Sequence, residues 1–252
     1  MLTFAVEPEF APWKKSRNFA EATVGGFKVH TATIGDASVD VVVTGMGPAN
    51  ARRVVEAVIS DSHAACISSG FAGSLKREHS VGEVLIAAAV ERVEDGGIIR
   101  CDVAMVREAE SAGGAKKVEK FLCAEKIADS AEGKSRLALL GDAIEMESYA
   151  ILSVAAKHSI PAVAIRAISD RFDEDMPVDF SGSIDDTGKI LKGKLALEIA
   201  GDPLKIPALI RLGRQTKLAS ERLIEFLESY IARLSVQDRG ETATGLEKAA
   251  RG

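Results

Sequence analysis

Residues 162–170 read Ala-Val-Ala-Ile-Arg-Ala-Ile-Ser-Asp, an apolar run that stops at a hydroxyl and an acid. Near-continuous apolar runs of this kind are typical of strands that are buried on both faces of a parallel sheet. We therefore expect Ala162–Ser169 to be a buried strand that delivers Asp170 to its carboxyl end. Other apolar or alternating runs predict strands at Leu2–Val6, Phe27–Ile34, Val39–Thr44, Ala64–Ser69, Glu83–Val93, Phe121–Ile127 and Ala143–Met146.

Stretches with helical spacing lie between or after these strands, at Pro48–Ser60, Ser130–Leu140, Ser148–His158, Leu191–Ile199 and Leu204–Leu234. Strands that alternate with helices imply a mainly parallel sheet covered on both faces. The predicted fold class is α/β, a single-domain three-layer αβα architecture with a mainly parallel, mixed central sheet. Residues 1–236 form this domain, and the polar residues 237–252 form a C-terminal tail. The charged, poorly periodic stretch 94–120 is expected to be irregular surface structure.

Composition and charge restrict the function classes. The chain has 252 residues and a net charge of −5, and it shows no basic stripe with interleaved aromatic residues, which argues against nucleic-acid binding. Its three cysteines, an odd number without CxxC spacing, favour neither a disulfide framework nor a zinc site and suit the reducing cytoplasm. Without a signal peptide or a run of about 20 apolar residues, we predict a cytoplasmic protein without a metal site.

Chemically active residues follow several of the predicted strands. Glu9 follows the first strand, Glu147 and Asp170 follow later ones, and the segment Gly70–Gly73 is expected to form a tight turn. In open α/β sheets the ligand site lies beyond the carboxyl ends of the strands, so one sheet would bring these residues together. Taken singly, each acid is explained as well by a helix cap or a solvated loop.

The ordered set of segments resembles the nucleoside phosphorylase and nucleosidase superfamily, with a phosphorylase/hydrolase-like fold. The pattern is most similar to the methylthioadenosine/S-adenosylhomocysteine nucleosidases. The C-terminal segments Asp175–Phe180 and Gly201–Leu209 are similar to hopanoid-associated phosphorylases, a branch linked to adenine release from an adenosylated hopanoid. The segments that carry the first resemblance are Ala5-x-Glu7-x-Glu9, Gly45-x-Gly47-x-x-Asn50-Ala51, Gly70-x-Ala72-Gly73-x-Leu75, Val81–Val84, Met146-Glu147 and Arg166–Asp170.

The resemblance implies cleavage of the N-ribosidic bond of a purine-type, adenosine-like nucleoside. Asp170 would protonate N7 of the base as a general acid, positioned by Ser169, and burial would keep this acid protonated. Glu147 would accept hydrogen bonds from the ribose hydroxyls, and Met146 would pack against the sugar. Glu9 would activate the attacking water. The remaining predicted substrate contacts are Glu145, Gly70, Phe71, Ala72, Gly73 and Ile127.

Water or phosphate as the nucleophile is the open question within this superfamily. Bacterial purine nucleoside phosphorylases place arginines where this chain has Ser68 and Glu9, and a carboxylate there repels phosphate. Hydrolysis without a cofactor is therefore favoured. Phosphorolysis, with inorganic phosphate as co-substrate held by Arg52, Arg53 or Lys14, is the alternative, possible on an adenosylated hopanoid.

This sequence departs from the nucleosidase pattern at two positions. Phe71 replaces a small hydroxyl residue, and Lys126-Ile127 stands where those enzymes place an aromatic residue against the base. Both differences leave the exact nucleoside open.

The sequence is less consistent with three other functions. An oxidoreductase of the Rossmann type is disfavoured because Asn50 replaces the third fingerprint glycine and no acid is placed for a ribose. A non-catalytic nucleoside-binding protein would not need the three acids Glu9, Glu147 and Asp170. The amphipathic segment Leu218–Leu234 is expected to pack on the core or on a second copy in a homodimer or larger homo-oligomer. Membrane contact is conceivable only if the substrate is lipid-linked.

Overall fold

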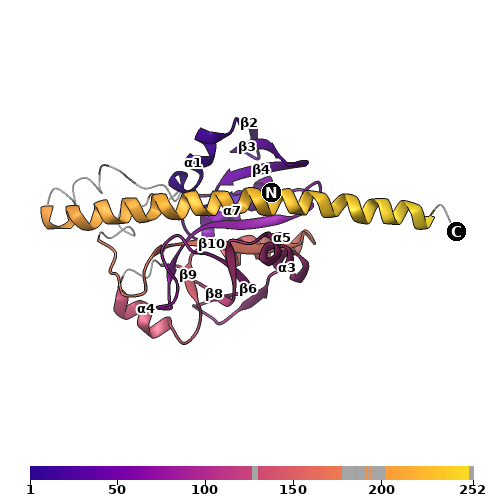
Figure 1. The fold of residues 1–252 in the computed structure, drawn as a ribbon. Helices are drawn as coiled ribbons and strands as arrows, with labels where there is room; N and C mark the ends of the chain where they lie inside the picture. Colours follow the sequence, from indigo (N-terminus) through magenta and orange to yellow (C-terminus); the bar gives the residue numbers. More distant parts are fainter. Residues whose placement is uncertain (127–129, 178–184, 186–190, 192, 194–201, 250–252) are drawn as a thin grey trace.

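The structure is a computed structural model that describes residues 1–126, 130–177, 185, 191, 193 and 202–249. Its strands are β1 (Leu2–Phe4), β2 (Ala20–Val24), β3 (Phe27–Ile34), β4 (Ala37–Val43), β5 (Cys66–Ser74), β6 (Val84–Arg92), β7 (Ile98–Arg100), β8 (Ala115–Cys123), β9 (Ala143–Glu145) and β10 (Ala162–Asp170). Its helices are α1 (Glu7–Ser16), α2 (Pro48–Val58), α3 (Val103–Ala112), α4 (Ala131–Leu137), α5 (Ser148–Lys157), the 3-10 turn η2 (Pro203–Lys205) and α7 (Ile206–Ala249) (Figure 1).

The strands form one mixed sheet in the order β10-β6-β8-β9-β5-β1-β4-β3-β2, with β7 on β6. The sheet contains parallel pairs such as β1–β4 and β5–β10 and antiparallel pairs such as β3–β4 and β6–β10. Because β10 pairs with both β5 and β6, the strands β10, β6, β8, β9 and β5 close on one another. The predicted α/β single domain with a mixed central sheet is confirmed.

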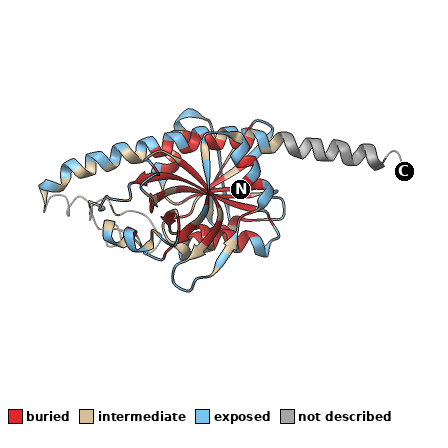
Figure 2. Ribbon diagram, turned by 60° about the horizontal axis from the view of Figure 1, so that its bottom comes forward, coloured by how far each residue is buried: buried red, intermediate tan, exposed pale blue. Residues whose placement is uncertain are grey.

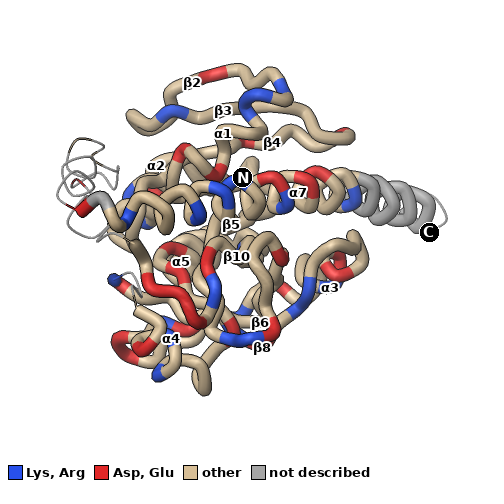
Figure 3. The backbone as a smooth tube through the Cα atoms, turned by 60° about the vertical axis from the view of Figure 1, so that its left-hand side comes forward, with Lys and Arg blue, Asp and Glu red and all other residues tan. Residues whose placement is uncertain are grey.

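Two groups of helices cover the sheet. α7 packs along β10 and contacts α1 and α3, whereas α2 and α5 pack on each other. Buried residues are concentrated in the strands and on the inner sides of these helices (Figure 2). Leu223, Leu227 and Tyr230 of α7 are fully buried, and the Tyr230 hydroxyl donates to the Met105 carbonyl over 3.0 Å. The apolar face expected in Leu218–Leu234 therefore packs on the core, while acidic and basic residues are interspersed on the outer elements (Figure 3).

The pairing of β5 with β10 places the glycine-containing segment beside the acid. Arg166 lies opposite Gly70 and Ile168 opposite Ala72, after which a register shift sets Asp170 opposite Gly73. A shift of this kind, a β-bulge, re-aims the side chains next to it. The expected tight turn at Gly70–Ser74 is wrong, because β5 runs through to Ser74 with a partner strand on each side.

The prediction of irregular structure for residues 94–120 is also wrong. This stretch contains β7, α3 and most of β8, and Asp102 begins α3 by accepting the Met105 N–H over 2.9 Å. Helix α3 is apolar on one face only, and the first half of β8 carries exposed lysines. Neither element therefore has the apolar run from which a buried element is predicted.

The two ends of the chain also differ from expectation. Helix α1, which was not expected, follows β1 directly, and α7 continues past Leu234 through Ala249 into the stretch predicted to be a tail. Most of the helix predicted at Leu191–Ile199 and part of the motif Asp175–Phe180 lie outside the described residues.

Candidate active site

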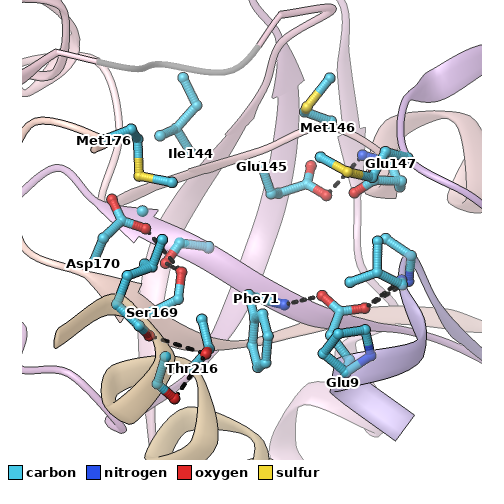
Figure 4. Close-up of a pocket in the computed structure, with 18 of the residues that line it drawn as sticks. Glu9, Phe71, Ile144, Glu145, Met146, Glu147, Ser169, Asp170, Met176 and Thr216 are labelled. Carbon is cyan, nitrogen blue, oxygen red and sulfur yellow. Dashed lines mark hydrogen bonds between the residues drawn. The ribbon is translucent and has the colours of Figure 1, made fainter. Parts of the chain in front are cut away.

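A cavity of about 370 Å³ opens at the carboxyl ends of β5 and β10, between the start of α1 and the first half of α7 (Figure 4). Segments that are far apart in the sequence meet there. Of the predicted site residues, its wall contains Glu9, Phe71, Ala72, Gly73, Glu145, Met146, Glu147, Ser169 and Asp170. The other described lining residues are Ala5, Val6, Pro8, Met46, Lys126, Ile144, Met176, Leu209, Leu212, Gly213 and Thr216. The predicted contact Ile127 lies outside the described residues.

Glu9 is fixed in the first turn of α1 by backbone groups. Its Oε2 accepts the N–H groups of Ala5 and Val6 over 2.7 and 3.0 Å, and its Oε1 accepts the Phe71 N–H over 2.8 Å. The residue is 3% exposed. Burial raises the pKa of Glu9, while the N–H groups of Val6 and Phe71 act in the opposite direction. The result is a rigid carboxylate of raised basicity on the cavity wall.

Gly70 makes room for this carboxylate. Its φ is +143°, and a Cβ built on it would lie 2.7 Å from Oε1 of Glu9. The predicted close backbone approach therefore exists, but the backbone approaches Glu9 and Gly70 does not line the cavity. We correct its predicted role from substrate contact to support of Glu9.

A buried ion pair lies beneath the wall at β9. The Arg166 guanidinium donates through Nη2 to Glu145 Oε2 over 2.6 Å and to the hydroxyls of Ser148 and Ser68 over 2.9 and 3.2 Å. Glu145 Oε2 also accepts the N–H groups of Glu147 and Ser148. Glu145 thereby fixes the chain at the end of β9, as a supporting residue would. Arg166 was quoted in the sequence motif, but its role as the buried counter-ion was missed.

Glu147 and Met146 follow β9 and both face the cavity (Figure 4). Oε1 of Glu147 accepts the Gly47 N–H over 2.7 Å, which ties it to the glycine turn after β4. Burial, followed by the negative charge of Glu145, raises the pKa of Glu147 to about 8. Glu147 is 6% exposed, and it lines the cavity, where a bound ligand can contact it.

Asp170 lies at the end of β10 with both carboxylate oxygens in hydrogen bonds. Oδ1 accepts the Ser169 hydroxyl over 2.8 Å, and Oδ2 accepts from the Lys134 ammonium group. Asp170 is 7% exposed, so it is as buried as expected. The Lys134 ammonium group that contacts Asp170 was not among the predicted site residues.

The wall made by α7 is apolar and was missed by sequence reasoning. Leu209, Leu212 and Thr216 recur at helical spacing and, with Met176, face the ends of the strands. Their spacing is the signal that identifies a helix face. In the sequence the same apolar face continues into the residues that fill the core. The pattern alone therefore does not distinguish the residues that line the cavity from those that pack in the core.

Two further properties concern the described residues only. No group of three or more histidine, cysteine or acidic side chains in that part of the chain is arranged to hold a metal ion. None of its helices has the length and apolar character needed to cross a bilayer. All three cysteines lie in the described part, and all are free and buried.

Comparison with known proteins places this fold and cavity in a family. The chain is 27% identical over 202 residues to a 5′-methylthioadenosine/S-adenosylhomocysteine nucleosidase of Shewanella sediminis, covering 70% of this chain and 87% of the relative. A second relative of the same description, from Shewanella halifaxensis, gives the same identity and coverage.

Solved structures show the same fold at lower identity. The 5′-methylthioadenosine/S-adenosylhomocysteine nucleosidase of Neisseria meningitidis, in complex with methylthio-immucillin-A, superimposes with a TM-score of 0.71 at 19% identity over 92% of this chain and 97% of the other. The futalosine hydrolase of Helicobacter pylori gives 0.69 at 17% identity over 91% and 95%. The family model described as the Phosphorylase superfamily matches residues 2–197, most of the chain. As the resemblance of its motifs predicted, the protein belongs to the Phosphorylase superfamily.

Proposed function

We propose that this protein hydrolyses the N-ribosidic bond of an adenosine-type nucleoside, with Asp170 as the acid and Glu9 as the base. Relatives named as methylthioadenosine/S-adenosylhomocysteine nucleosidases support the substrate class. The observation that carries the choice of water is the charge of the cavity. Its described lining residues include four acidic side chains, at Glu9, Glu145, Glu147 and Asp170, and one lysine, at Lys126. Behind the wall, Glu145 and Asp170 are paired with Arg166 and Lys134, which leaves no described cation free to bind phosphate there except Lys126.

This charge balance disfavours phosphate. Phosphate sites are usually built from arginine forks or several backbone N–H groups. The arginines considered for that role, Arg52 and Arg53, lie on α2, and neither they nor Lys14 are among the lining residues. Arg53 donates instead to Asn50. The N–H groups near the expected nucleophile site already bind Glu9, so a dianion would meet a carboxylate there.

The base of the reaction is Glu9. Its three backbone hydrogen bonds hold both oxygens in place, and its raised pKa increases its ability to take a proton from water. As the glycosidic bond breaks, positive charge develops on the sugar. The ionised Glu147, together with the nearby Glu145, stabilises that charge, and Glu147 holds the ribose hydroxyls.

The acid of the reaction is Asp170. A purine leaves as an anion unless N7 is protonated, and a positioned carboxylic acid supplies that proton. The Ser169 hydroxyl, which donates to Oδ1, fixes the carboxyl plane. The apolar wall of Met176, Leu209 and Leu212 excludes water from the leaving base.

A product assay tests the nucleophile. Adenosine, methylthioadenosine and S-adenosylhomocysteine are incubated with the protein in phosphate-free buffer and in buffer with phosphate, and the sugar product is identified. We expect the free sugar and adenine at the same rate in both buffers. Formation of a sugar 1-phosphate, or strict dependence on phosphate, would refute hydrolysis and support the phosphorylase alternative, a pentosyl transfer. Tight binding without any turnover would indicate a nucleoside-binding protein.

Self-association and a cytoplasmic location also stay predictions. Ile206, Ile210 and Leu218 expose apolar side chains at helical spacing on α7 next to the cavity, which supports a homo-oligomer. The free cysteines fit a reducing compartment. Light scattering coupled to size-exclusion chromatography distinguishes a monomer from a dimer or larger assembly. Release of adenine from an adenosylated hopanoid is tested by adding that substrate to the product assay.

A further inference from the structure

Helix α4 lies on the outside of the fold but contains a fully buried lysine, Lys134. Lys134 is 0% exposed, although α4 is a short helix of seven residues on the outside of the fold. Its neighbours Glu132 and Arg136 are exposed and pair with each other across one turn. Burying an ammonium group costs several kcal/mol unless it is paired and hydrogen-bonded. The contacts of Lys134 therefore have to account for its position.

All three contacts of the Lys134 ammonium group are with the end of β10 and the loop after it. Nζ donates to Oδ2 of Asp170, to the Arg171 carbonyl over 2.8 Å and to the Glu174 carbonyl over 3.0 Å. An ammonium group has three N–H donors, so all of them are used. The Ser169 hydroxyl donates to the other oxygen of Asp170, so Lys134 and Ser169 together hold both oxygens of this carboxylate.

We propose that Lys134 is the positioning residue that supplies the proton with which Asp170 activates the leaving base. This inference rests on the proposed function, in which Asp170 protonates N7. In the resting site Lys134 and Asp170 form an ion pair. A carboxylate paired with an ammonium group has no proton to donate unless the ammonium group transfers one to it. For Asp170 that ammonium group is Lys134.

The transfer balances as follows. While the C1′–N9 bond breaks, its electron pair moves onto the purine, whose basicity rises as the bond lengthens. A proton moves from Lys134 Nζ to the Asp170 carboxylate, which leaves a neutral amine, and the resulting carboxyl group passes a proton to N7. Water forms the new C1′–O bond and gives a proton to Glu9. After release of the free sugar and the neutral base, Glu9 loses its proton to solvent and Lys134 regains one.

The carbonyl contacts explain why the transfer is confined to one direction. Arg171 and Glu174 offer neutral carbonyl oxygens, which hold the ammonium group without accepting its proton. Of its three acceptors, only the carboxylate is a base. The N-terminal end of α4 is tied to the same loop by the Ala131 N–H, which donates to Asp175 Oδ1 over 2.8 Å, so helix and loop hold the geometry together.

The experiment compares Lys134→Met with Arg136→Met, a charge removal on the exposed side of the same helix. We expect Lys134→Met to lower kcat for the purine nucleoside about 10²-fold, the low end for general acid catalysis, with KM unchanged. Arg136→Met leaves both constants unchanged. On p-nitrophenyl β-ribofuranoside, whose phenolate leaves without a proton, Lys134→Met should keep the wild-type kcat. An equal loss on both substrates would overturn the proposal, because it indicates a structural role.

A double-mutant cycle gives an independent decision. If Lys134 acts through Asp170, adding Lys134→Met to Asp170→Asn lowers kcat no further. Losses that multiply would overturn the proposal, and so would a single variant with unchanged kcat. Cleavage of the nucleoside by the wild-type protein is the separate test of the proposed function. If the wild type releases no base, both proposals fail; if it does and the cycle multiplies, only this one fails.

Discussion

Gly70→Ala should lower kcat for hydrolysis by about 10²–10⁴-fold by displacing Glu9, although Gly70 itself does not line the cavity. The added Cβ would lie 2.7 Å from Oε1 and 3.1 Å from Oε2 of Glu9. A side-chain end usually moves aside cheaply, but this one is 3% exposed and held by the N–H groups of Ala5, Val6 and Phe71. Displacing it breaks at least the Phe71 bond.

The magnitude follows from these contacts. A side chain at φ +143° is strained by about 1–3 kcal/mol. Leaving the buried Phe71 N–H unsatisfied destabilises the fold by about 1–3 kcal/mol more. Loss of a positioned general base lowers kcat by about 10²–10⁴-fold. Gly113→Ala is the matched control, because Gly113 also has a positive φ (+75°) but a Cβ there meets nothing within 4 Å. It should show the strain alone, with kcat unchanged.

The assay measures hydrolysis of methylthioadenosine, adenine affinity and urea unfolding for both variants. Adenine affinity should stay at the wild-type value in Gly70→Ala, because the acid side of the cavity is intact. Wild-type kcat in Gly70→Ala would refute the assignment of Glu9 as a fixed base. If that variant does not fold, Glu9→Gln, which keeps the volume of the side chain, takes its place and should lose turnover by the same factor.

Three further changes test other parts of the site and fold. Asp170→Asn should lose about 10²–10⁴-fold in kcat while keeping nucleoside affinity, measured by single turnover and equilibrium binding; unchanged turnover would contradict the acid assignment. With the pKa of Glu147 raised to about 8, the free protein carries this proton at neutral pH, and ribose hydroxyls favour the ionised form. Nucleoside binding at pH 7 should therefore release a proton and tighten as the pH rises towards 8, which calorimetry in two buffers detects and Glu147→Gln abolishes. For the fold, Tyr230→Phe removes the bond to Met105 and should lower the free energy of unfolding by about 1–3 kcal/mol, whereas Ser229→Ala on the exposed side of α7 should not.

The pH dependence of stability has a sign that follows from the same carboxyl group. The pKa of Glu147 is 4.5 in the unfolded reference and about 8 in the fold, so the folded protein binds more protons between these values. Stability contributed by this group is fully present below pH 4.5 and is lost as the pH rises through about 8. Arg166 limits the loss because it offsets part of the charge that appears on Glu147, whereas the negative charge of Glu145 enlarges it.

The site could be predicted from the sequence where strands deliver the residues. Ser169-Asp170 and Glu145–Glu147 each follow an apolar run, and the carboxyl ends of neighbouring strands meet at one edge of the sheet. The order of the strands in the sheet is sufficient to predict that these residues converge on the cavity. Lys134 could not be found in this way, because it lies in a polar helix between charged residues and only the tertiary structure shows that it points inward.

The parts of the fold that were missed share a physical reason. The first half of β8 carries the exposed residues Lys116, Lys117 and Glu119, and the strand is continuously buried only from Phe121 on, so the sequence showed its second half alone. In α1 a proline, Pro12, stands inside the helix and the apolar residues are few, yet Phe10 and Trp13 are fully buried in an aromatic cluster. In both elements, tertiary packing outweighs weak local preference.

The two central carboxylates of the cavity owe their different proposed roles to the groups that hold them. Glu9 is bound by backbone N–H groups, which do not give up their protons, so it can gain a proton only from water or substrate. Asp170 is bound by a hydroxyl and an ammonium group, and the latter can replace a proton that Asp170 has donated. Environment divides acid from base in other enzymes with paired carboxylates. Here the difference between the acid Asp170 and the base Glu9 follows from whether their hydrogen-bond donors can release a proton. Exchanging the donors should therefore exchange the roles of acid and base. Removing the ammonium group takes away this proton source for Asp170, so activation of the purine as leaving group should be slower.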